Sequence, residues 1–205
     1  SFASEETVSL DFSPKNYYKI REEVYAEGNS IPEEVPMNFS FKNSLPIKDY
    51  IIQEVKKLNT EIDISSYGIL REDMSALILS IFEVPELYYM STSARYSYVT
   101  DPDTNIQYGE KILFTYTMDS SQIAAADAII DGVLQDYLSG IKPEWNDLEK
   151  ALYTNNYLCL NCSYATNIID SSHTLYGALV DKVPVCDGYS KAFKFLLSKV
   201  GVESL

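Results

Sequence analysis

Cys186 is the residue whose type and position best suit covalent chemistry. It follows Pro184 and opens a segment in which apolar residues recur every three or four positions, which predicts an amphipathic helix over about residues 187–200. Gly201 follows that segment, where a left-handed helix cap favours glycine. N–H groups and the dipole at a helix start stabilise an anion, so a thiol there ionises more readily than usual. The same N–H groups can stabilise the oxyanion that forms when a thiolate attacks a carbonyl.

A second interpretation of Cys186 stays open at this point. Unpaired cysteine is among the most buried residue types, which is the argument for a packed structural cysteine. The short sequence motifs around Cys186 help to choose between the two interpretations. They are YGAL at residues 176–179, PVCDGYSKAF at residues 184–193, LL at residues 196–197 and GVES at residues 201–204.

These motifs resemble the nucleophile motif of the bacterial transglutaminase-like superfamily, whose members share a papain-related fold. The resemblance covers about residues 148–205, and on it Cys186 matches the catalytic cysteine. Ser190 stands where the family usually has alanine, a change of one small residue for another. The family often has HDYL where this chain has NNYL at residues 155–158, which removes a titratable pair from the preceding helix.

His173 is the only histidine, so a cysteine–histidine pair within this chain must use it. It lies in a serine-rich loop, where it is either the base or a surface or helix-start residue. The resemblance implies that the base histidine and its orienting aspartate follow the cysteine, on strands of a sheet. The chain ends at Leu205, before any such residues, so we expect a truncated catalytic unit with little or no turnover.

Cys159 and Cys162 form a C-x-x-C on a predicted helix over residues 144–162. They share one stripe with Leu148 and Leu152, which favours packing in the core over a redox or zinc role. Zinc would need two further ligands, and Cys186 and His173 are the only other candidates of that kind. We therefore expect reduced thiols, no metal and no cofactor.

Composition restricts the classes of partner. The chain has 205 residues, 16 basic and 30 acidic, and its net charge of −14 disfavours nucleic acid and anionic membrane surfaces as partners. No apolar run reaches transmembrane length, and residues 1–6 lack the pattern of a signal peptide. Three cysteines are too few for a disulfide framework. These features suit a cytoplasmic protein or the mature part of a secreted one, and the resemblance favours an exported or cell-surface bacterial protein.

Periodicity and turn residues predict the remaining elements. The pattern indicates helices, a β-hairpin with a turn at residues 101–105, and short strands. The expected helices cover residues 13–28, 46–58, 71–83 and 120–138, the hairpin strands cover residues 96–100 and 106–117, and the short strands cover residues 37–42 and 61–64.

We therefore expect an α+β fold in which a helical layer carrying Cys186 packs on antiparallel strands, most of the catalytic sheet being absent. Residues 1–140 are predicted to form an N-terminal α+β region, and residues 141–205 the first half of a transglutaminase-like core. The expected function is acyl transfer from amide groups of a protein or peptide substrate, with water or an amine as acceptor. The alternative is a non-catalytic cell-surface binding module, in which the seventeen tyrosines serve recognition.

Overall fold

The structure is a computed structural model that describes residues 6–13, 16, 19–20, 22–23 and 46–203. Helices and an antiparallel sheet both occur, which confirms the predicted α+β class. Contacts divide the chain into two units, Ser1–Glu83 with Tyr89–Thr117, and Val84–Tyr88 with Met118–Leu205. The predicted division of the chain at residue 140 stays a prediction.

The first unit is built on a four-stranded antiparallel sheet. Its order is β1-β3-β4-β2, so the central pair is the predicted hairpin, which is confirmed. Asp101 closes the hairpin turn, since its carboxylate accepts the N–H of Asp103 at 2.8 Å. The strands are β1 (Glu6–Asp11), β2 (Glu61–Asp63), β3 (Met90–Thr100) and β4 (Gln107–Tyr116).

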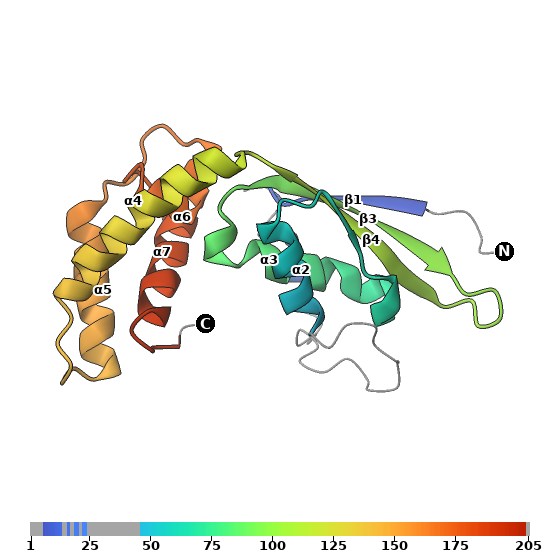
Figure 1. Ribbon diagram of the computed structural model, residues 1–205, viewed down its shortest axis with the longest axis horizontal. Coiled ribbons are helices and arrows are strands. Elements are labelled where there is room, and N and C mark those ends of the chain that lie inside the picture. Colours follow the sequence, from blue (N-terminus) through green and yellow to red (C-terminus); the bar gives the residue numbers. More distant parts are fainter. Residues whose placement is uncertain (1–5, 14–15, 17–18, 21, 24–45, 204–205) are drawn as a thin grey trace. The chain divides into compact units, whose positions relative to one another are not determined.

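Two helices cover one side of this sheet, α2 (Ile47–Lys56) and α3 (Met74–Phe82) (Figure 1). Phe82 of α3 packs between Phe12 and Phe114, with ring centroids 4.4 and 6.1 Å away. Both helices agree with the predicted spans. The predicted strand over residues 37–42, and most of the predicted helix over residues 13–28, lie outside the described residues.

The second unit is helical over its described residues. It contains α4 (Ser120–Ser139), α5 (Asp147–Asn161), α6 (Leu175–Leu179) and α7 (Cys186–Ser198), together with the 3-10 turns η3 (Pro85–Leu87) and η4 (Asp170–His173). In the described part of the chain, no helix combines the length and apolar character needed to cross a membrane.

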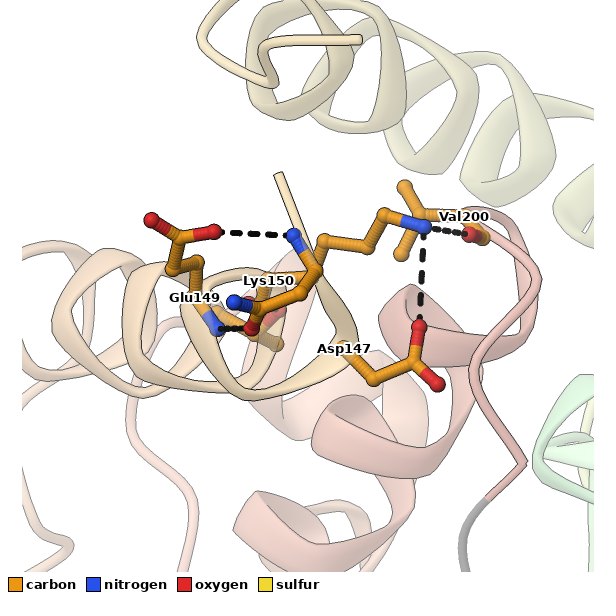
Figure 2. Close-up of polar contacts among 6 residues, drawn as sticks. Asp147, Glu149, Lys150 and Val200 are labelled. Atoms are coloured by element: carbon orange, nitrogen blue, oxygen red, sulfur yellow. Dashed lines mark hydrogen bonds and ion pairs between the residues drawn. The ribbon is translucent and has the colours of Figure 1, made fainter. Parts of the chain in front are cut away.

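Capping boxes determine where the two long helices begin. The N-cap of α4 is Asp119, because its carboxylate accepts two N–H groups of the first turn. Helix α5 begins at Asp147, three residues later than predicted. There the Asn146 side chain accepts the N–H of Glu149 at 3.0 Å, and the Glu149 carboxylate accepts the N–H of Asn146 at 2.8 Å (Figure 2).

The predicted orientation of α5 is wrong. Leu148 and Leu152 have relative exposures of 68% and 56%, and Cys159 is also exposed. The buried side of α5 instead carries Thr154 and Leu158, flanked by the rings of two tyrosines. Helix α5 buries its tyrosines because the tyrosine ring has a large apolar area in spite of its polar hydroxyl. The rings of Tyr153 and Tyr157 lie 5.5 and 5.3 Å from that of Tyr137 on α4.

We expect Asn146→Ala to lower the free energy of unfolding of the second unit by about 1 kcal/mol, the usual cost of a lost N-cap. Asn155→Ala is the matched control, because Asn155 is exposed on the same helix, and there we expect a change within about 0.5 kcal/mol. Urea unfolding followed by circular dichroism measures both. Equal effects of the two substitutions would contradict the role of the capping box.

Candidate functional site

Helix α7 begins at Cys186, which confirms the predicted position of this thiol at a helix start. Cys186 is exposed, so the alternative of a buried structural cysteine is wrong. The preceding residue, Val185, is the N-cap and has no polar side chain with which to cap the first turn. Gly201 adopts φ +74°, as predicted for a left-handed residue after the helix. The buried side of α7 consists of Gly188, Ala192, Phe195, Leu196 and Leu197.

The first turn of α7 lies directly against the backbone of η4. The N–H of Val185 donates to the carbonyl of Ser172 at 2.9 Å. A Cβ at Gly188 would overlap the same carbonyl oxygen and the side chain of Pro184. A Cβ at Gly177 of α6 would likewise overlap the carbonyl of Ser171. These two glycines are therefore required where three segments meet beneath Cys186.

A second contact holds the chain that leads into α7. The N–H of Ser163 donates to the carbonyl of Lys182 at 2.9 Å, and the N–H of Ala165 to that of Pro184 at 3.1 Å. Between these bonds, Tyr164 stacks on Tyr189 with ring centroids 6.3 Å apart. The segment after α5 thus holds the residues that lead into Cys186 from the other side.

The far end of α7 is held by α5. Lys150 donates from Nζ to the carbonyl of Val200 at 3.1 Å and lies 3.8 Å from a carboxylate oxygen of Asp147 (Figure 2). Carbonyl groups at a helix end lack partners within the helix, so this bond satisfies one that follows α7. Both ends of α7 are therefore tied to neighbouring segments of its own unit.

His173 and Asp187 form a hydrogen-bonded pair beside the thiol. Nδ1 of His173 lies 3.0 Å from Oδ2 of Asp187, and the two side chains are only 18% and 14% exposed. A carboxylate only accepts hydrogen bonds, so Nδ1 carries the proton in this bond. The other oxygen, Oδ1, lies 3.6 Å from Sγ of Cys186, with the thiol as donor.

The sequence did not predict this pair. It placed His173 in a serine-rich loop. The two residues are 14 positions apart and belong to different elements, so no helical or strand periodicity connects them. The one available signal was a lone histidine just before a predicted cysteine-bearing helix.

The two cysteines of the C-x-x-C lie in different environments. Cys162 is half-buried and donates to the carbonyl of Ala178 at 3.2 Å, and burial raises the pKa of its thiol. Cys159 is exposed, so its predicted place in the core is wrong. Over the described ranges, no group of three or more histidine, cysteine or acidic residues is arranged to bind a metal ion.

Comparisons with protein-family models, with curated proteins and with solved structures find no match to this chain. A functional assignment therefore rests on the geometry around Cys186 and on the motif residues themselves.

Gly188→Ala should lower the free energy of unfolding by about 1–3 kcal/mol, because the added methyl group has no space against the Ser172 carbonyl. Gly132→Ala is the control, since Gly132 also lies within a helix but a Cβ there meets nothing within 4 Å. That change should raise stability by up to about 1 kcal/mol through helix propensity. Chemical unfolding of the two variants tests this, and a stabilising Gly188→Ala would show that the close contact is not a constraint.

Proposed function

We propose that Cys186 is the nucleophile of an acyl-transfer enzyme of the transglutaminase-like class. The observation that carries the proposal is an exposed thiol at the first residue of a 13-residue helix, held at both ends and adjoined by a histidine–aspartate pair. Helix starts favour thiolates, and an exposed thiolate is available to a large substrate. A purely structural cysteine needs neither property.

The reaction begins when the Cys186 thiolate attacks the carbonyl carbon of a substrate amide. The carbonyl π electrons move to oxygen, and N–H groups at the start of α7 stabilise that oxyanion. Collapse of the intermediate re-forms the carbonyl, breaks the C–N bond and leaves a thioester on Cys186, while the leaving amine takes a proton. Water as acceptor then gives hydrolysis, and an amine gives a new amide bond.

The resemblance implies a histidine, oriented by an acidic residue, that follows α7 in sequence and carries the proton from the thiol to the leaving amine. It also implies an antiparallel sheet against which α7 packs. No step of this mechanism requires a metal ion or an organic cofactor.

A protein or peptide is the substrate class we propose. Cys186 is exposed and so accessible to a chain much larger than a metabolite, and the net charge of −14 opposes nucleic acids. The resemblance favours an exported or cell-surface bacterial protein over a cytoplasmic one, and we propose that location.

The three cysteines allow an internal comparison of thiol reactivity. At pH 7 we expect iodoacetamide to modify Cys186 at least about tenfold faster than Cys159, because Cys159 is also exposed but lies far from a helix start. Cys162 should react slowest, because a raised pKa leaves less thiolate at neutral pH. Peptide mass spectrometry after timed quenching gives the three rates from one sample.

Acyl transfer itself is tested with an activated ester, p-nitrophenyl acetate. We expect an acetyl thioester on Cys186 that is lost on treatment with hydroxylamine and does not form in Cys186→Ser. Modification of Cys159 at an equal or greater rate in both assays would contradict the proposal and favour the alternative of a binding module.

A further inference from the structure

The two oxygens of the Asp187 carboxylate face two different groups. Oδ2 accepts a hydrogen bond from His173, and Oδ1 lies next to the thiol of Cys186. We propose that His173 is a positioning residue that acts through Asp187, holding this carboxylate so that Cys186 stays reactive. The proposal rests on the proposed function, because it assigns roles to residues next to the same nucleophile.

The position of His173 is set by backbone contacts. It is the last residue of η4, and the N–H groups of Ser172 and Thr174 on either side donate to Ile169 and Ser171 at 2.9 Å each. The carbonyl of Ser172 accepts the N–H of Val185, the residue just before Cys186. The imidazole is thus attached to a segment that is itself bonded to the start of α7, so its distance from Asp187 does not depend on a flexible loop.

The carboxylate needs such a restraint because of where it lies. Asp187 is the second residue of α7, where a negative side chain is attracted to the N–H groups of its own first turn. In that position it would compete with a substrate oxyanion for the same groups. A carboxylate that moved closer to Sγ would also oppose formation of the thiolate, since like charges repel.

The hydrogen bond from His173 counters both effects. It fixes the side-chain rotamer of Asp187 and draws the negative charge towards Oδ2, the oxygen that faces the imidazole. The contact with Sγ is the longer of the two, at 3.6 Å against 3.0 Å for the bond to Nδ1. His173 takes no proton from the thiol in this proposal, which separates its role from that of a catalytic base.

Four variants separate these roles, namely His173→Ala, His173→Asn, Asp187→Ala and the double variant His173→Ala/Asp187→Ala. In the asparagine variant the amide nitrogen stands near the position of Nδ1, so it keeps a donor for Asp187 but has no basic nitrogen. The measured quantity is the iodoacetamide rate constant of Cys186 at pH 7. Cys159 in the same sample is the internal reference, and circular dichroism checks the fold of each variant.

We expect His173→Ala to lower the iodoacetamide rate constant of Cys186 at least about tenfold. A misplaced group near a reacting atom produces a loss on that scale. His173→Asn should stay within about twofold of the unmodified protein. In a protein that already carries Asp187→Ala, the further change His173→Ala should alter the rate constant of Cys186 less than about twofold. The reason is that the carboxylate through which His173 acts is already absent.

Two results would overturn the proposal. If His173→Ala lowers the rate constant of Cys186 equally with and without the Asp187 side chain, the imidazole acts on the thiol directly. No loss from His173→Ala would show that the pair only supports the fold. Failure of the proposed function is a separate result, since it would appear in the unmodified protein as a Cys186 no faster than Cys159.

Discussion

The close contact between the first turn of α7 and the backbone of η4 is the constraint on which the rest of the second unit depends. Only glycine fits at residue 188, and the bond from Val185 to Ser172 needs that proximity. The same contact brings His173 within hydrogen-bond distance of Asp187. A side chain at residue 188 would separate α7 from η4. The packing between them and the His173–Asp187 pair beside the thiol would then both be lost.

Tyrosine has a packing role in this unit that its abundance alone does not reveal. Tyr137 is completely buried, and its hydroxyl lies 2.7 Å from Oγ1 of Thr154. Tyr157 donates to a carboxylate oxygen of Asp136 at 2.8 Å, and burial with this neighbour raises its pKa, so it stays a neutral donor. Aromatic rings fill the space between α4 and α5 while each hydroxyl finds an acceptor on the helices. This use of tyrosine needs no binding partner to explain it.

The elements that the sequence predicted well are those whose signal is local. The periodicity of residues 187–200 and Gly201 located α7 to within a few residues, and turn chemistry at Asp101 located the hairpin. Helix α5 was oriented wrongly because leucine outranks tyrosine in hydrophobicity, whereas the fold buries the tyrosine rings. The histidine–aspartate pair could not be predicted at all, since it depends on how two elements meet in space. The sequence therefore predicted that Cys186 lies at a helix start, but it did not predict which residues surround the thiol.

The bond from Lys150 to Val200 has a mechanical consequence. Helix α7 is a rod of 13 residues, about 20 Å long at 1.5 Å per residue, with the lysine bond just beyond one end and the thiol at the other. Opening of the first turn of α5 would release that bond and let the rod pivot about its contact with η4. Local unfolding free energies of α5 and α7 are then coupled, and hydrogen exchange in both helices should follow one cooperative opening. The position of Sγ thus depends on the N-cap of α5, a helix that is bonded to the opposite end of α7.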